Sequence, residues 1–186
     1  DMELSQLDKI YLSNLINYNK VVNQRNKLLK ELSFKSSEEK LETLDIWDLQ
    51  LVKYGTEVMK RRVGFVQELN EIIGGLHEKL SGGTEKLMIE YQPCVEETTF
   101  LDTVTKMRER DLRMKSTCFG PHKDDLIFFI NGSEVKKYGS QGQQRTAALS
   151  LKLAEIELVK KVVKDTPVLL LDDVLSEIDS NRQQFL

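Results

Sequence analysis

The sequence predicts a helix-rich α/β fold, in which long antiparallel helical arms precede short strands, a further long helix and one buried strand. Apolar residues recur every three or four positions over most of the first 80 residues, and no proline occurs before Pro93, which predicts the arms. Residues 167–172 form a continuous apolar run of the kind found in a parallel strand that is buried on both faces. Helices therefore dominate the first half of the chain, and strands enter in the second.

The two arms are predicted from capping signals as well as from periodicity. A near-heptad apolar seam over residues 4–32 predicts one long helix. Ser37, followed by two glutamates, offers an N-cap and an acidic first turn for a second helix that continues to Leu80, over roughly 60 Å at about 1.5 Å per residue. Because the connecting loop is short, we expect the two helices to pack antiparallel. Glycine pairs at 74–75 and 82–83 predict a weak point and then the end of the second helix.

The rest of the chain predicts alternating strands and helices. We expect, in order, a strand at 87–91, a helix at 97–114, a hairpin with strands at 125–130 and 133–137, and a helix at 140–163. Asn131-Gly132 is the favoured two-residue turn of such a hairpin. Within the 97–114 helix, we expect Leu101, Val104, Met107 and Leu112 to face inward.

The composition indicates a chain that buries a core, since 40% of its 186 residues are hydrophobic and 31% are charged. The net charge of −3 gives no overall attraction to nucleic acid, so any DNA contact must come from a local basic patch. Cys94 and Cys118 form no C-x-x-C motif, and we expect buried reduced thiols in place of a zinc site or a disulfide framework. No apolar stretch approaches the ~20 residues of a membrane span and no signal-peptide pattern opens the chain, so we expect no membrane contact and a cytoplasmic protein.

The apolar run ends in two carboxylates that predict a site for Mg²⁺ and a nucleotide. On such a strand, termed Walker B, the first acid binds the metal and the second orients the attacking water, so we assign these roles to Asp172 (metal) and Asp173 (catalytic). An ordinary parallel strand with two carboxylates at its edge is the alternative. Ser176 and Asp179 favour the nucleotide site, because they match the small-x-x-Asp turn, the D-loop, that follows Walker B in ATP-binding-cassette (ABC) ATPases.

Upstream of that strand, the segment Ser140-Gln141-Gly142-Gln143-Gln144-Arg145 predicts a helix start that faces an anion. Gly142 allows a close approach of the backbone, while Ser140 and the first amides lie at the positive end of the helix. A capped helix start without a ligand is the alternative. In ABC ATPases the signature motif holds this place and contacts the γ-phosphate of ATP bound by the opposite subunit, which implies a dimer with ATP between its subunits. The residues to which we assign nucleotide binding are Ser140, Gly142, Gln143, Gln144, Arg145, Ser176 and Asp179.

None of the ten glycines is followed by lysine, so the phosphate-binding loop G-x-x-x-x-G-K-[ST] is absent. We therefore expect a chain that carries half of an ATPase, without the Walker A half, and that does not hydrolyse ATP by itself. The helical pattern begins at once and the chain stops soon after Asp179, so we also expect a fragment. His122, beside two aspartates, is interpreted as a packing or hydrogen-bonding residue and not as a metal ligand, and His77 as structural.

Three segments together resemble the RecF family of bacterial recombination mediators, which are SMC-like ABC ATPases of DNA repair. The segments are G-P-H-K-D-D at 120–125, Y-G-S-Q-G-Q-Q-R-T at 138–146 and L-L-L-D-D-V-L-S-E-I-D at 169–179. Gln141 replaces a signature glycine and Asp173 replaces the usual catalytic glutamate, and both departures agree with this family. The resemblance implies three ranges. These are a helical hairpin arm of lobe II at 1–83, the α/β remainder of lobe II with the connection to the head at 84–137, and the signature helix, Walker B strand and D-loop of an incomplete ABC head at 138–186.

The resemblance also implies activities and partners. These are binding of ATP with Mg²⁺, ATP-dependent homodimerisation, slow hydrolysis by the parent protein, binding of single-stranded and double-stranded DNA, and handover to RecO and RecR. The associated processes would be recombinational repair, replication restart and the SOS response. For DNA contacts we select Lys106, Arg110 and Arg113, with a solvated helix face as the alternative. The rival functions are a non-enzymatic protein- or DNA-interaction module and the head of another SMC-like ABC ATPase.

Overall fold

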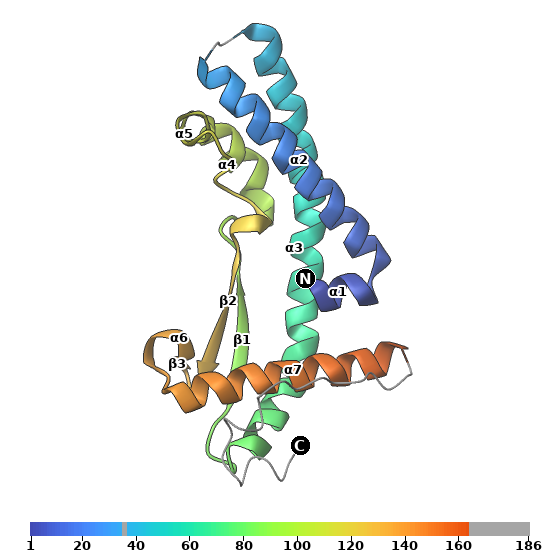
Figure 1. The fold of residues 1–186 in the computed structure, drawn as a ribbon, viewed down its shortest axis with the longest axis vertical. Coiled ribbons are helices and arrows are strands. Elements are labelled where there is room, and N and C mark those ends of the chain that lie inside the picture. Colours follow the sequence, from blue (N-terminus) through green and yellow to red (C-terminus); the bar gives the residue numbers. More distant parts are fainter. Residues whose placement is uncertain (35–36, 164–186) are drawn as a thin grey trace. The chain divides into compact units, whose positions relative to one another are not determined.

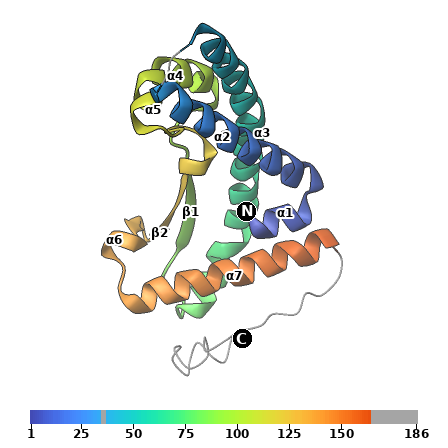
Figure 2. The same cartoon turned by 45° about the horizontal axis from the view of Figure 1, so that its top comes forward.

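Long helices dominate the structure, a computed structural model that describes residues 1–34 and 37–163. The helices α2 (Lys9–Phe34), α3 (Glu38–Leu80) and α7 (Gln141–Val163) are joined by short helices and a three-stranded sheet (Figures 1 and 2). The described chain divides into two compact units. Unit 1 comprises Asp1–Val63 and Gln92–Asp125, and unit 2 comprises Gly64–Tyr91 and the described part of Leu126–Leu186. The α/β, helix-rich fold class is confirmed.

Unit 1 is built on the antiparallel pair formed by α2 and the first part of α3, with α4 (Phe100–Lys106) and α5 (Arg108–Met114) beside it (Figure 1). Buried leucines of α2 and α3, with Leu112 of α5, form an apolar cluster at the end of this pair: Leu29, Leu32, Leu44, and the partly buried Leu28 and Leu41. The predicted antiparallel arms are therefore confirmed, because their seams bury leucines against one another.

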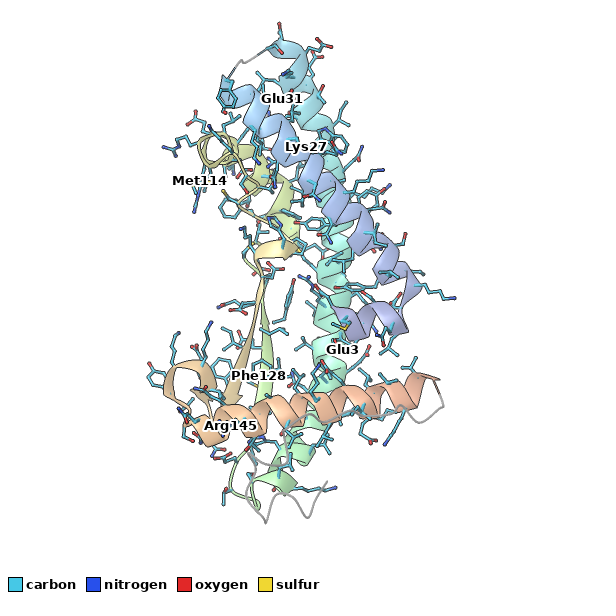
Figure 3. All side chains as sticks on the ribbon, viewed as in Figure 1. Glu3, Lys27, Glu31, Met114, Phe128 and Arg145 are labelled. Carbon is cyan, nitrogen blue, oxygen red and sulfur yellow. The ribbon has the colours of Figure 1, made fainter. Side chains whose placement is uncertain are left out.

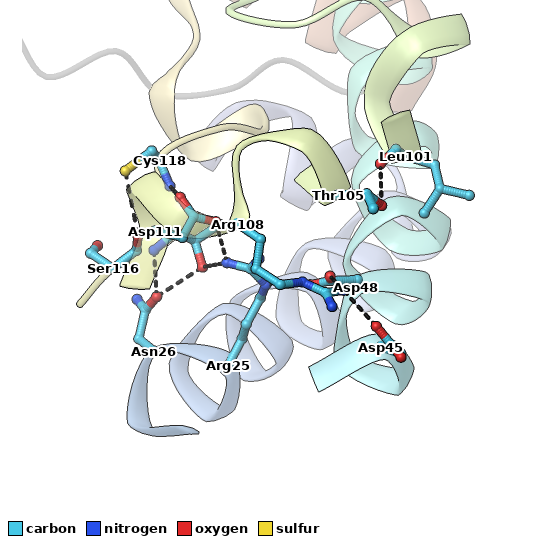
Figure 4. Close-up of polar contacts among 11 residues, drawn as sticks. Arg25, Asn26, Asp45, Asp48, Leu101, Thr105, Arg108, Asp111, Ser116 and Cys118 are labelled. Carbon is cyan, nitrogen blue, oxygen red and sulfur yellow. Dashed lines mark hydrogen bonds and ion pairs between the residues drawn. The ribbon is translucent and has the colours of Figure 1, made fainter. Parts of the chain in front are cut away.

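Unit 1 also contains a buried ionic network centred on Arg25 (Figure 4). Its guanidinium is fully buried and lies 2.6 Å from carboxylate oxygens of both Asp48 and Asp111, and it donates to the Thr117 hydroxyl at 3.0 Å. The second Asp48 oxygen accepts from Arg108 at 2.6 Å. Charged groups are seldom buried without such partners. Because the partners of Arg25 come from different elements, the network links α2, α3, α5 and the following loop.

Unit 2 packs the last part of α3 and the helix α7 with the sheet. The strands β1 (Leu87–Gln92), β2 (Asp125–Ile130) and β3 (Ser133–Glu134) lie in the order β1-β2-β3, and β2 pairs with β3 antiparallel, with Ile130 opposite Ser133. The residues of the shared apolar core come from α3, the strands and α7: Val66, Leu69, Ile73, Leu87, Ile89, Ile130, Val135, Ala147, Ala154 and Leu158. Ala147, Ala154 and Leu158 attach α7 to this core.

Three predicted elements differ from the structure. The first helix is divided at Asp8, which is extended between α1 (Met2–Leu7) and α2 and whose carboxylate accepts from the amides of Ile10 and Tyr11 at 2.9 Å. The 97–114 helix is divided into the 3₁₀ turn η1 (Glu97–Thr99), α4 and α5, with a break at Met107. The return strand has only two residues, because Val135 begins the short helix α6 (Val135–Tyr138).

These breaks change which side chains are buried. Leu101 and Met107 were expected to face inward and are both 41% exposed, whereas Val104 is buried as expected. The break at Met107 changes the helical phase, so one continuous seam cannot describe both halves. The expectation of buried thiols is wrong, because Cys94 is exposed and Cys118 is only partly buried, although both cysteines are free thiols. None of the helices in the described ranges is long and apolar enough to cross a membrane.

Candidate functional site

The start of α7 is the part of the predicted nucleotide site that the structure describes. Ser140 caps the helix: its hydroxyl accepts from the Gln143 amide at 3.2 Å, and the Gln143 side-chain oxygen accepts from the Ser140 amide at 2.9 Å. This reciprocal pair is a capping box, with glutamine at the third helical position. The backbone of Gly139, which precedes the cap, lies close to that of Val135: a Cβ on Gly139 would lie 2.6 Å from the Val135 carbonyl oxygen.

The first turn of α7 leaves donors available for an anion. Gln141 and Gly142 are exposed, and among the described residues their amides have no hydrogen-bond partner, as expected for the first helical positions. The Ser140 hydroxyl accepts from Gln143 and still has its own hydrogen to donate. No acidic residue lies in the first turn, in contrast to α3, which begins with Glu38 and Glu39. The donor set therefore fits a phosphate oxygen.

The remaining motif residues make contacts inside the protein. The Gln143 side chain bonds Ser140 through its oxygen and Glu85 through its nitrogen, the latter at 2.9 Å. Gln144 donates to the carbonyl oxygen of Gly139 at 3.2 Å and so supports the turn before the helix. Arg145 follows on the exposed surface of α7 (Figure 3). Ser140 and Gly142 thus offer groups outward, while the glutamine side chains hold the local backbone.

A polar group that sequence reasoning did not select adjoins this site. Glu85 bonds Gln143 through one carboxylate oxygen, and its other oxygen lies 3.1 Å from His77 Nε2. His77 is fully buried, and its Nδ1 lies 2.9 Å from the Ser150 hydroxyl of α7. No sequence signal identified Glu85, because the residues that it joins lie far apart in the chain.

The other predicted nucleotide-site residues, Asp172, Asp173, Ser176 and Asp179, lie outside the described residues. Their assigned roles stay predictions. Within residues 1–34 and 37–163, no group of three or more histidine, cysteine or acidic side chains could hold a metal ion.

The three predicted DNA-contact residues lie at the end of α4 and on α5, in unit 1. Lys106 is 77% exposed at its side chain and lies 4.0 Å from Asp102. Arg110 lies over the Phe119 ring, 5.4 Å from its centroid, and Arg113 is exposed. The break at Met107 separates Lys106 from the two arginines, so the three residues do not follow one regular helix.

The 120–125 segment is a hydrogen-bonded turn. Tyr18 and His122 Nδ1 are 2.6 Å apart, and His122 Nε2 lies 2.9 Å from the Thr117 carbonyl oxygen. A carbonyl can only accept, so Nε2 carries the proton and Nδ1 accepts from the Tyr18 hydroxyl. Desolvation lowers the pKa of His122 and raises that of Tyr18, which keeps both groups neutral. The interpretation of His122 as a hydrogen-bonding residue is confirmed.

Comparison with known proteins gives matches along all 186 residues. The chain is 64% identical to the DNA replication and repair protein RecF of Lachnospira eligens and 46% identical to RecF of Halalkalibacterium halodurans, and covers 51% and 52% of these proteins. A solved structure of the recombination mediator protein RecF with ATP, in the RecFOR pathway, matches with a TM-score of 0.87 at 38% identity, over 98% of this chain and 50% of that one. The similarity to these RecF proteins therefore extends along the whole of this chain.

The resemblance to RecF inferred from three short segments is thus extended to the helical arms. No family model matches the chain. The chain spans about half the length of the curated RecF relatives that it matches. A second solved RecF structure, with ATPrS, matches with the same TM-score of 0.87 and covers 98% of this chain. ATP binding is a property of those RecF structures, and the start of α7 is where the described residues of this chain offer donors to a phosphate.

Proposed function

We propose that this chain forms part of a RecF-type, ATP-dependent DNA-binding protein that acts in recombinational repair, replication restart and the SOS response. The observation that carries the proposal is the similarity to RecF along all 186 residues of this chain, at 64% identity to one relative, in a chain whose α7 begins with an exposed, capped set of phosphate donors. The protein would work in the cytoplasm, with RecO and RecR as partners and single-stranded and double-stranded DNA as ligands.

Within this proposal, Ser140 and Gly142 bind the terminal phosphate of ATP held by a second subunit. The hydroxyl of Ser140 and the amide of Gly142 supply the donors, and the positive end of α7 favours the phosphate charge. Asp172 would hold Mg²⁺ and Asp173 would orient the attacking water. Bound Mg²⁺ would neutralise charge on the phosphates. Without a phosphate-binding loop, residues 1–186 alone should not hydrolyse ATP.

Variants of Ser140 test the nucleotide role. Ser140→Asp keeps a good N-cap, because aspartate and serine cap helices about equally well, but it places a negative charge where the phosphate would lie. In the complete gene product, we expect thermal stability close to that of the wild type and loss of Mg²⁺-ATP-driven dimerisation, measured by light scattering. Ser140→Ala should lose both part of the cap and part of the dimerisation. Wild-type dimerisation by Ser140→Asp would refute the nucleotide role.

Salt dependence tests the DNA role of Lys106, Arg110 and Arg113. Each phosphate contact that is lost should reduce the slope of log K against log salt by about 0.9 for duplex DNA, so replacement of all three by alanine should reduce it by up to about 2.7. The matched control replaces three exposed lysines of α2 and α3 and removes the same charge: Lys9, Lys20 and Lys79. Equal slopes for the two triple variants would show that these residues make no phosphate contacts of their own.

A further inference from the structure

A carboxylate in the turn after α3 lies between two groups that both reach α7. One oxygen of Glu85 accepts from Gln143 Nε2 at 2.9 Å, and the other lies 3.1 Å from His77 Nε2. His77 has no exposed surface, and its other ring nitrogen lies 2.9 Å from Ser150. Two bonds therefore attach α7 to this region: Gln143, in its first turn, bonds the turn after α3, and Ser150, further along, bonds His77 near the end of α3.

The turn that carries Glu85 is itself held at both ends. Gly82 and Gly83 have φ values of +67° and +82°, and the Gly83 amide bonds the Glu78 carbonyl at 2.8 Å, which ends α3 with a tight reversal. After Glu85, the Asn131 side chain accepts from the Lys86 amide at 2.9 Å. A side chain on such a fixed backbone keeps its direction without the loss of entropy that a mobile loop would incur on ordering.

Both ends of the Gln143 side chain are bonded within the protein in this arrangement. Its oxygen accepts from the Ser140 amide at 2.9 Å, and its nitrogen donates to Glu85. Its backbone amide is used by the Ser140 hydroxyl. Gln143 therefore connects Glu85 to the cap, and the outward donors belong to its neighbours in the first turn.

We propose that Glu85, anchored by His77, is a positioning residue for the start of α7: it orients Gln143 and, through it, Ser140 and the first-turn amides. This inference rests on the proposed function, since it names the residue that aligns the phosphate donors. Binding groups act only when they are held close to the productive geometry by supporting bonds. A bond from a neutral amide to a carboxylate is stronger than one between neutral groups, so Glu85 suits this task.

A double-mutant cycle with hydrogen exchange tests the link without nucleotide. In the complete gene product, Glu85→Ala should speed amide exchange of residues 143–146 by about tenfold, the loss expected for one hydrogen bond to a charged group. Gln143→Ala removes this bond and the bond to the Ser140 amide, so it should speed exchange at least as much. The double variant should exchange no faster than Gln143→Ala alone, because the link to Glu85 is already lost in that variant. Glu85→Gln retains an acceptor for Gln143 but loses the charge, so its exchange should lie between that of the wild type and that of Glu85→Ala. Glu78→Ala is the matched control, since it removes an exposed carboxylate from the end of α3.

Additive effects in the double variant, or unchanged exchange in Glu85→Ala, would overturn the proposal. The second measurement is Mg²⁺-ATP-driven dimerisation, which Glu85→Ala should weaken by about tenfold while ATP affinity of the monomer stays within about twofold. A general loss of stability would instead weaken both dimerisation and the ATP affinity of the monomer. If Glu85→Ala alters exchange as expected while Ser140→Asp still dimerises, the nucleotide role fails and the positioning of α7 by Glu85 stands. If Glu85→Ala alters exchange but leaves dimerisation unchanged, while Ser140→Asp abolishes it, Glu85 is not a positioning residue for the phosphate donors.

Discussion

Removal of the Arg25 side chain should destabilise unit 1 more than any surface charge change. Arg25→Ala deletes three bonds: to Asp48 at 2.6 Å, to Asp111 at 2.6 Å and to Thr117 at 3.0 Å. Breaking a buried ion pair costs about 3–5 kcal/mol, because the partner charge stays buried without compensation.

The structure places the expected loss in the lower part of that range. Asp48 retains Arg108 at 2.6 Å, so Asp111 is the carboxylate left without its cation. The Nη2 atom of Arg25 is buried and has no hydrogen-bond partner within the described residues, so the native network already carries one unfavourable group. We therefore expect a loss of about 3 kcal/mol, which is a large part of the about 5–15 kcal/mol that stabilises a typical domain.

Urea denaturation followed by Trp47 fluorescence measures this loss. Trp47 is the single tryptophan, and it lies in unit 1 directly before Asp48. With a slope of about 1–3 kcal/mol per molar urea, the midpoint of Arg25→Ala should fall by about 1–3 M. Asp45→Ala is the control, because the Asp45 side chain is 60% exposed and its pair with Arg108 is expected to contribute about 0–1 kcal/mol. A midpoint for Arg25→Ala no lower than that for Asp45→Ala would refute the reasoning.

Two further predictions concern Gly120 and His122 in the 120–125 turn. Gly120→Ala should lower the free energy of unfolding by about 2–5 kcal/mol, because its Cβ would lie 2.3 Å from the Tyr18 hydroxyl at a φ of +124°. The control, Gly75→Ala in α3, places its Cβ where nothing lies within 4 Å and should raise the free energy of unfolding by about 0.5–1 kcal/mol. Thermal melts in which the melting temperatures of both variants shift the same way would contradict this. The lowered pKa of His122 means that the unfolded chain takes up the proton first as pH falls, so its contribution to stability is complete above about pH 6.5 and is lost as pH falls through the folded pKa. The urea midpoint by Trp47 fluorescence should fall between pH 7.5 and pH 5.5 in the wild type, and it should fall less in His122→Gln; equal pH dependence in the two proteins would show that the ring does not titrate as inferred.

Local patterns were sufficient for the long helices. The seams of α2 and α3, the acidic start of α3 and the glycines after Leu80 are each signals within one or two turns, and the structure has helices at these positions. The same holds for the start of α7, where Ser140 and Gln143 form a capping box from residues three apart.

The breaks at Asp8 and Met107 were missed for a different reason. Both lie inside apolar patterns that continue on either side, so periodicity alone predicts a continuous helix. At Asp8 the carboxylate bonds the Ile10 and Tyr11 amides, which offers the backbone an alternative to the helical bonds. Periodicity does not register this competition.

The polar networks could not be predicted, because their members are distant in sequence. Arg25 lies 86 residues from Asp111, and Glu85 lies 58 residues from Gln143. In the sequence each is an ordinary charged residue in a polar segment, and only the folded chain brings the partners together. The predicted metal and D-loop residues, from Asp172 onward, lie outside the described residues and stay predictions.

The contacts of Gln143 change how variants of the α7 start must be interpreted. By its place in the motif, Gln143 was assigned to the nucleotide, and its loss would then remove one phosphate contact. In the structure, its loss removes the Ser140 backbone bond and the Glu85 bond together. Gln143→Ala should therefore disturb the helix start even without nucleotide, whereas Ser140→Asp should not, since the cap is retained. Only the Ser140 variant separates phosphate binding from the architecture that supports it.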